Sequence, residues 1–333
     1  MNTPANSFHH VPSGGIVGVR EDITDMIYDI SPMDTIFTSS IGRGKAKQSL
    51  HEWQMDQLEA ASSAAAPNAQ IDGDDAVNTT PTLTQRLNNR CQIGSKTAQV
   101  TGRAEVAVKA GRDSEMNYQM ARRMRALKRD VESEACQNGP ISGGTTSAAP
   151  RAGGFETWIY TAVAGSRGAG GAATQGATPL TATQHQPTVA TQPTDGTQRD
   201  ITEAIFKGEL QYRWNLGGAS PIVIAGPVNK QKIDGFAGNA TPMISADKEV
   251  RIATFSVYKS PFGNHKIVPS RWNRERSVLI VDPEYVALSY FRGYRTTNLA
   301  ITGDSRRKQI LVDWTLEMKN PDAQGIIADL NVT

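Results

Sequence analysis

The sequence predicts a mixed α+β fold, and three observations carry this prediction. A long amphipathic helix is expected over residues 113–137, and several short strands of alternating or continuous apolar residues follow residue 220. No segment repeats at a period of 20–50 residues, which excludes solenoids and propellers. The chain has 333 residues, 38% of them hydrophobic, and this is enough for one large core or two smaller ones.

Residues 1–49 are expected to form an N-terminal arm. Residues 1–20 are polar and interrupted by Gly and Pro, so they should be extended. Apolar residues at helical spacing then predict a short amphipathic helix over 21–30, ended by Ser31-Pro32. This apolar face consists of Ile23, Met26, Ile27 and Ile30, and a cluster of Ile36, Phe37 and Ile41 follows it.

Residues 50–104 are expected to form an extended loop built as a long β-hairpin. Residues 51–58 and 89–108 both alternate in the manner of strands, and we predict that these two runs pair. At about 3.3 Å per residue the hairpin would reach tens of ångströms from its base, with too little apolar surface to fold alone. It would therefore need a neighbouring molecule to lie on.

Residues 105–139 are expected to form a second unit around a long spine helix, joined by a returning strand within residues 305–333. Apolar residues recur every three or four positions from 113 to 137, which predicts a helix about 37 Å long. Asp113 and Glu115 favour its first turn, and Asn138-Gly139-Pro140 supplies the stop. The apolar stripe is Met116, Met120, Met124, Leu127, Val131 and Ala135.

Residues 140–304 are expected to form a third unit, which opens with a loop-rich insertion at 140–199. The insertion is rich in Gly, Ala, Thr and Ser, so we predict an irregular surface excursion anchored by Trp158 and Ile159. A helix over 200–215 should follow, with Ile201, Ile205, Leu210 and Trp214 near one face and Gly217-Gly218 at its end. We predict a further helix at 228–236 and strands at 222–225, 252–258, 266–268, 278–281 and 309–317.

Composition excludes several functional classes. No window is apolar enough to span a bilayer, and residues 1–10 lack the pattern of a signal peptide, so we expect a cytoplasmic protein without membrane contact. The net charge of +2 gives no global field for nucleic acid, so any DNA contact should be local and weak. Cys91 and Cys136 form no Cys-x-x-Cys pair, which argues against structural zinc and a disulfide scaffold.

No motif predicts catalysis, a metal or a cofactor. Residues 39–46 (SSIGRGKA) lack the first Gly and the final hydroxyl of a phosphate-binding loop, and the Gly-rich run 165–171 follows no predicted strand. No Gly-x-Ser-x-Gly elbow is present, although a hydrolase site assembled from scattered Asp, Ser and His stays open as an alternative. The histidines are scattered, at His9, His10, His51, His185 and His265.

A basic band on the spine helix is the one candidate surface for nucleic acid. It consists of Arg122, Arg123, Arg125, Lys128 and Arg129. Point-charge attraction to DNA phosphates is one interpretation. The favoured interpretation is a solvated or intersubunit face, with the cations paired along the helix to Asp130, Glu132 and Glu134.

Local sequence in the expected arm and hairpin resembles one branch of tailed-phage major capsid proteins. The arm match is Asp22-Ile23-Thr24-Asp25 followed by Ile30 to Thr35, although Ile36 stands where that branch usually has Pro. The hairpin match begins at His51-Glu52-Trp53-Gln54. Further matches follow in order along nearly the whole chain, at residues 110–112, 115, 128–130, 154–159, 229–231, 235–240, 268–269, 282–285, 303–304 and 315–317.

The resemblance implies the Hong Kong 97-type capsid fold, with an N-terminal arm, an extended loop, a peripheral domain on the spine helix and an axial domain. It implies a non-enzymatic shell subunit of the virion that assembles in the host cytoplasm into hexameric and pentameric capsomers around phage DNA. Expected partners are the portal, a separate scaffolding protein and decoration proteins. The alternative is a shell protein of a non-viral compartment with the same fold.

Overall fold

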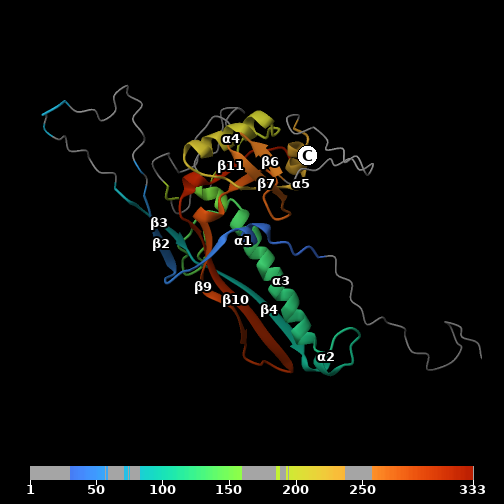
Figure 1. Cartoon of the computed structure of the whole chain (residues 1–333). Helices are drawn as coiled ribbons and strands as arrows, with labels where there is room; N and C mark the ends of the chain where they lie inside the picture. Colours follow the sequence, from blue (N-terminus) through green and yellow to red (C-terminus); the bar gives the residue numbers. More distant parts are fainter. Residues whose placement is uncertain are drawn as a thin grey trace, which may run out of the picture.

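The computed structural model describes residues 31–56, 58, 71–73, 75, 83–159, 185–187, 193, 195–236 and 257–332. These residues form two β-sheets flanked by helices, together with a short two-stranded hairpin (Figure 1). The mixture of helices and strands confirms the predicted α+β class. The helix predicted at 21–30, most of residues 57–82, all of residues 160–184 and most of the strand predicted at 252–258 lie outside the described residues.

The predicted spine helix and the strand predicted at 309–317 are confirmed. Helix α3 (Glu115–Cys136) begins after Ser114, whose hydroxyl accepts a hydrogen bond from the Asn117 amide. It packs on a four-stranded sheet ordered β1 (Gly42–Lys45), β9 (Val286–Asn298), β10 (Ser305–Met318) and β4 (Gln92–Thr101). Strand β1 is parallel to β9, and the other pairings are antiparallel. Most of the predicted stripe is buried, with Met120 and Met124 half-buried against the core.

The long hairpin predicted between residues 51–58 and 89–108 is wrong in its second strand. Strand β2 (Leu50–Met55) pairs with β3 (Gln85–Arg90), while β4 pairs with β10 over ten residues. The end of the predicted strand is instead helix α2 (Gly102–Val106). Joining β10 lets β4 bury Ala98 and Val100 against Met116 of α3, which an isolated hairpin would leave in water.

The second sheet has five strands and lies at the other end of the molecule (Figure 1). Helix α4 (Glu203–Asn215) covers this end, and α5 (Pro227–Asp234) follows the central strand. The face predicted for α4 needs one correction, because Trp214 is exposed and Phe206 and Leu210 are the buried anchors. The strand order is β11 (Gly325–Ile327), β8 (Val278–Val281), β5 (Ile222–Ala225), β7 (Gly263–Pro269) and β6 (Val257–Ser260).

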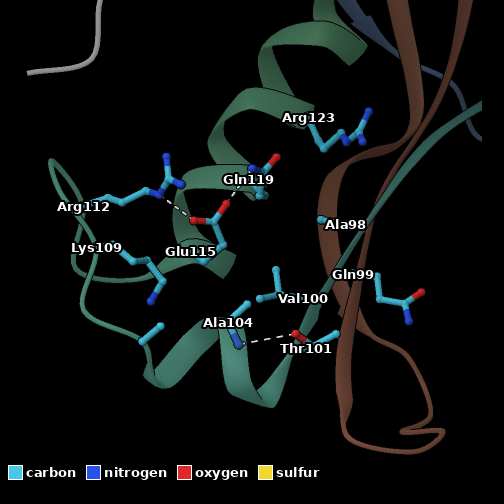
Figure 2. Close-up of a pocket in the computed structure, with 11 residues that line it drawn as sticks. Ala98, Gln99, Val100, Thr101, Ala104, Lys109, Arg112, Glu115, Gln119 and Arg123 are labelled. Carbon is cyan, nitrogen blue, oxygen red and sulfur yellow. Dashed lines mark hydrogen bonds and ion pairs between the residues drawn. The ribbon is translucent and has the colours of Figure 1, made fainter. Parts of the chain in front are cut away.

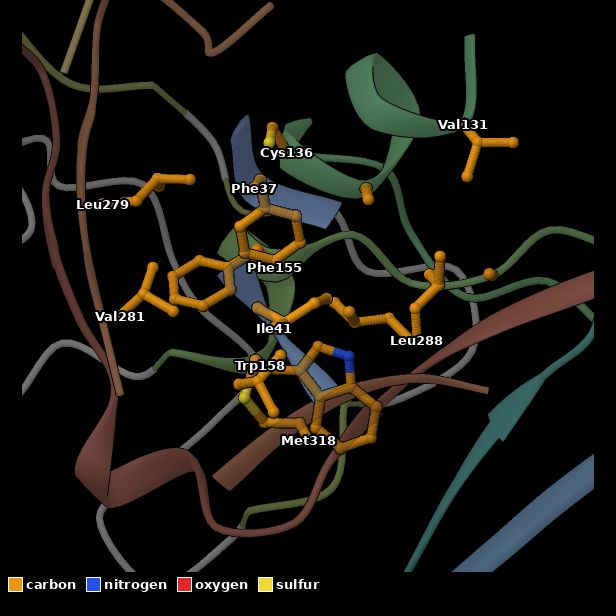
Figure 3. Close-up of a cluster of buried hydrophobic side chains, with 14 of the residues drawn as sticks. Phe37, Ile41, Val131, Cys136, Phe155, Trp158, Leu279, Val281, Leu288 and Met318 are labelled. Atoms are coloured by element: carbon orange, nitrogen blue, oxygen red, sulfur yellow. The ribbon is translucent and has the colours of Figure 1, made fainter. Parts of the chain in front are cut away.

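One hydrophobic core joins the two sheets and contradicts the surface location predicted for residues 152–159, whereas residues 142–151 are exposed or half-buried as predicted. Figure 3 shows Phe155 and Trp158 of the 3₁₀ turn Phe155–Trp158 among side chains from both sheets and from helix α1 (Ile36–Ser40). The Phe37 and Phe155 rings meet edge to face with centroids 5.6 Å apart. The small residues of this segment therefore serve close packing. Two shorter 3₁₀ turns, Pro283–Tyr285 and Pro321–Ala323, precede β9 and β11.

Candidate interaction surfaces

Helix α1 is anchored to the spine helix by one carboxylate. The Glu132 side chain is fully buried, and its two oxygens accept the backbone amides of Phe37 at 2.6 Å and Thr38 at 2.8 Å. The residue before α1 offers no side-chain cap, so Glu132 satisfies first-turn donors that the helix cannot satisfy itself. This part of the predicted arm is thereby fixed to the C-terminal part of α3.

Glu132→Ala should lower the free energy of unfolding by roughly 2 kcal/mol or more, because it leaves two buried amides without acceptors. Burial raises the pKa of the Glu132 carboxyl above its ordinary value, against the lowering effect of the Thr38 and Phe37 amides. A raised carboxyl pKa means that the native state binds the proton more tightly than the unfolded state. Stability from this group is thus present below the unfolded pKa and is lost as pH rises through the folded one.

Urea unfolding of the unassembled protein between pH 4.5 and 8 measures both effects. The difference between wild type and Glu132→Ala should shrink as pH rises through that window. Asp130→Ala is the matched control, since Asp130 lies one half-turn earlier on α3 and pairs only with partly exposed Lys96. This control should cost less than about 1 kcal/mol. Equal losses in the two variants would contradict the anchoring role.

The basic band does not have the partners predicted for it. Asp130 pairs with Lys96 of β4, Glu132 binds α1, and Glu134 accepts from Gln92 of β4 at 2.7 Å. Among the described residues, no ion pair joins any of the five band cations to an acid. Two guanidiniums stack on aromatic rings instead, Arg122 on Tyr118 at 5.8 Å and Arg129 on Trp272 at 5.4 Å.

Part of the band lines a groove of about 240 Å³ beside the point where the described chain begins. The lining residues are Ser31, Met33, Gln119, Arg122, Arg123, Arg125, Ala126 and Arg129. The Arg129 guanidinium lies over the Trp272 ring. Trp272 also donates its indole N–H to the Asp34 carbonyl at 2.8 Å. The groove is therefore walled on one side by α3 and on the other by residues that follow the predicted arm helix.

The far end of the four-stranded sheet, here called the distal tip, comprises residues 102–108 and 299–304. It is held together by the Gly102 amide, which donates to the Asp304 carbonyl at 3.1 Å. Three large apolar side chains are exposed there: Val106 is 86% exposed, Val108 97% and Ile301 73%. Beside them lies a hollow of about 500 Å³ between β4, α2 and the start of α3 (Figure 2).

The hollow at the distal tip has no arrangement for catalysis. Its one carboxylate, Glu115, is bound by Arg112 at 2.5 Å and accepts from Gln119 at 2.7 Å (Figure 2). The remaining walls are small apolar side chains, the polar side chains of Gln99 and Thr101, and the cations Lys109 and Arg123. An open apolar and basic surface of this kind fits contact with another macromolecule better than it fits turnover of a small substrate.

Each histidine that the structure describes lies within hydrogen-bond distance of other residues of the fold. His51 lies 3.0 Å from a Glu317 oxygen that Ser289 also bonds at 2.6 Å, so the carboxylate stands between the hydroxyl and the imidazole. Buried His185 bridges Gln85 and Asp322. His9 and His10 lie outside the described residues.

The nearest approach to a nucleophile and base is Ser260 with His265, 2.7 Å apart. The other ring nitrogen of His265 faces the Ser220 carbonyl at 2.7 Å, which places the proton there and makes Nε2 an acceptor. The Ser260 hydroxyl oxygen also accepts the Phe262 amide at 3.1 Å, so it closes the turn between β6 and β7. No carboxylate orients this imidazole as in a hydrolase triad.

Other sequence candidates have structural roles too. Gly44-Lys45 lie in strand β1, paired with Ser289 and Tyr290, and not in a phosphate-binding loop. Cys91 and Cys136 are buried free thiols, and burial together with the charge of Asp313 raises the pKa of Cys91 to about 11. Within the part of the chain that the structure describes, no cluster of His, Cys, Asp and Glu has the makings of a metal site. None of the described helices is long and apolar enough to cross a membrane.

Comparisons with known proteins agree with the geometry. The family model described as SU10 major capsid protein matches residues 2–331. The chain is 23% identical to the major capsid protein of Escherichia phage Phieco32 over 339 residues, which cover 93% of this chain and 94% of that protein. Both matches span almost the whole length of the chain.

Solved structures show the same fold. The capsid asymmetric unit of cyanophage A-1(L) matches with a TM-score of 0.67 and 11% identity, covering 95% of this chain and 98% of that one. A holo-SrpI encapsulin complex from Synechococcus elongatus PCC 7942 matches with a TM-score of 0.52 and 10% identity, covering 95% and 98%. The fold is thus the Hong Kong 97-like capsid fold, as the resemblance in the arm and hairpin implied.

Proposed function

Because this chain belongs to the SU10 major capsid protein family, we propose that it forms hexameric and pentameric capsomers that close into the shell around phage DNA. As a major capsid protein it is a structural component of the virion and not an enzyme. The observation that carries the finer proposal is the distal tip, whose exposed valines and isoleucine need a partner. A second copy of the chain supplies one at every repeat of a symmetric shell.

The proposed assignment of domains follows the two observed sheets. The four-stranded sheet with α3 would be the peripheral domain and the five-stranded sheet with α4 and α5 the axial domain. This proposal moves β9 out of the axial unit predicted at 140–304 and moves β11 into it. The proposed arm covers residues 1–49, and β2 and β3 form the base of the extended loop. Portal, scaffolding and decoration proteins are proposed partners, with assembly in the host cytoplasm and weak, non-specific contact with packaged DNA.

Val106→Glu combined with Val108→Glu should abolish closed shells without unfolding the subunit. Both side chains are exposed in the isolated chain, so the change costs the monomer little, whereas like charges buried at a contact between copies oppose assembly. Electron microscopy and sedimentation of the protein produced with its phage's scaffold give the readout. The thermal transition of the unassembled variant is the control and should match wild type. Normal shells from this variant would remove the distal tip from the proposal.

The alternative is the shell of a non-viral compartment, for which the encapsulin match is the specific observation. The two readings differ in cargo. Native particles should contain nucleic acid that resists nuclease until the shell is opened. Particles that hold protein and no nucleic acid would favour the compartment.

A further inference from the structure

The arginine groove, defined as the groove lined by Arg122, Arg125 and Arg129 of α3 with Ser31 and Met33, has charge without a described counter-ion. Residues 122 and 125 are exposed, residue 129 is half-buried, and the acids of the same helix are engaged elsewhere. Several cations held side by side on one helix face repel one another and favour an anionic occupant.

We propose that the occupant is the acidic stretch 21–29 of the same chain. This stretch carries Glu21, Asp22, Asp25 and Asp29 against the single cation Arg20 beside it. It is also tethered to the groove, because Asp29 precedes the groove residue Ser31 by two positions, at most about 7 Å along an extended chain. Such a short tether gives the acids a high effective concentration at the arginines.

The spacing of the two sets is complementary. Arg122, Arg125 and Arg129 are separated by three and four residues, and so are Asp22, Asp25 and Asp29. On α3 this spacing puts the arginines on one face over about 10 Å. If residues 21–30 adopt the helix that their sequence predicts, the three aspartates line a face of the same length. The occupied groove would be shielded from DNA phosphates, which places DNA contact of this chain elsewhere.

A thiol crosslink tests this placement on the full chain before assembly. Asp25→Cys with Arg125→Cys should be joined by a short bismaleimide, with the product keeping the mass of one chain. Native Cys91 and Cys136 are buried, so each single-cysteine control should take up one maleimide at the introduced thiol and give no crosslink within the chain. The matched control pair is Asp25→Cys with Ile301→Cys, exposed on the distal tip, and this pair should not crosslink. Absence of the 25–125 crosslink, or a crosslinked dimer, would overturn the proposal.

A charge swap distinguishes residues 21–29 from DNA as the occupant of the arginine groove. Arg122→Glu with Arg129→Glu, or Asp22→Lys with Asp29→Lys, should each lower the rate of the 25–125 crosslink by roughly fivefold, the factor for losing two exposed ion pairs. Combining all four changes should restore it. If the combination fails to restore crosslinking, and the arginine changes alone weaken the retention of DNA in particles with rising salt, DNA is the occupant. The proposed shell function is tested separately, by microscopy of assembled particles. Failure of one proposal therefore leaves the other standing.

Discussion

Gly154→Ala should destabilise the unassembled protein by about 3 kcal/mol or more, because among the described glycines it would bring a methyl group nearest to a backbone atom. A Cβ at Gly154 would lie 2.0 Å from the Gln137 carbonyl oxygen and 3.2 Å from that of Glu134. Both carbonyls belong to the C-terminal end of α3, so relief requires moving the spine helix or the turn after Gly154. That turn holds Phe155 and Trp158, which are fully buried in the shared core.

Gly208→Ala is the matched control for this change. Gly208 lies in the middle of α4, and a Cβ there would have no atom within 4 Å. Alanine in a helix interior should stabilise by about 0.5–1 kcal/mol, through helix propensity and a less flexible unfolded chain. Urea unfolding of both variants measures the contrast. A Gly154→Ala protein within 0.5 kcal/mol of wild type, roughly the spread of neutral surface changes, would show that residues 152–159 are not packed as described.

Glu209→Ala should cost about 3–5 kcal/mol, because it leaves a buried guanidinium without its counter-ion. Both Glu209 and Arg213 side chains are fully buried, with the Arg213 Nε 2.7 Å from the carboxylate. Arg213 also donates to the Asp322 carbonyl at 3.3 Å, which ties α4 to the chain just before β11. Loss of the carboxylate therefore weakens the attachment of α4 to the five-stranded sheet.

Replacing both partners shows why Glu209→Ala is destabilising: because Arg213 is left buried without a counter-ion, or because the attraction between the two charges is lost. Glu209→Leu combined with Arg213→Met fills similar volume with apolar atoms and should recover most of the stability, since desolvation of the two charges offsets much of their attraction. Lys207→Ala on the same helix removes a cation that is half-exposed and should leave the urea midpoint almost unchanged. A double variant as unstable as Glu209→Ala would contradict this account and point to packing instead.

The spine helix was predictable because its signal is local. Six apolar residues at spacings of three and four specify one face, and Ser114 and the Asn-Gly-Pro stop delimit it within a few residues. The alternation of residues 92–101 likewise predicted a strand. Its partner was not predictable, because β10 lies more than 200 residues later in the chain. Strand pairing at that distance depends on which apolar faces the whole fold needs to cover.

Two other errors have physical causes in tertiary packing. Residues 152–159 look like part of a surface loop by composition, yet Gly154 lets the turn that carries Phe155 and Trp158 approach the end of α3. Strand β9 was not predicted, because its first four residues are all buried while the rest alternate around Gly293. Neither segment shows a single helix or strand periodicity along its whole length.

The candidate surfaces were partly predictable. The basic band was evident in the sequence, but its expected acidic partners contact α1 and β4 instead. Buried backbone amides of α1 and Lys96 of β4 compete for the same carboxylates. The signal that points to another partner was also present, in the acidic residues 21–29 at matching spacing. The exposed valines of the distal tip fell within a predicted strand and were identified only once α2 was seen.

Electron cryomicroscopy of native particles decides whether this chain builds the shell. We expect a closed shell built from many copies of this chain, each with α3 along the four-stranded sheet, contacts between copies at the distal tip, and nucleic acid inside. A particle in which this chain is absent from the shell, or a chain that stays monomeric when all its phage's head proteins are present, would contradict it.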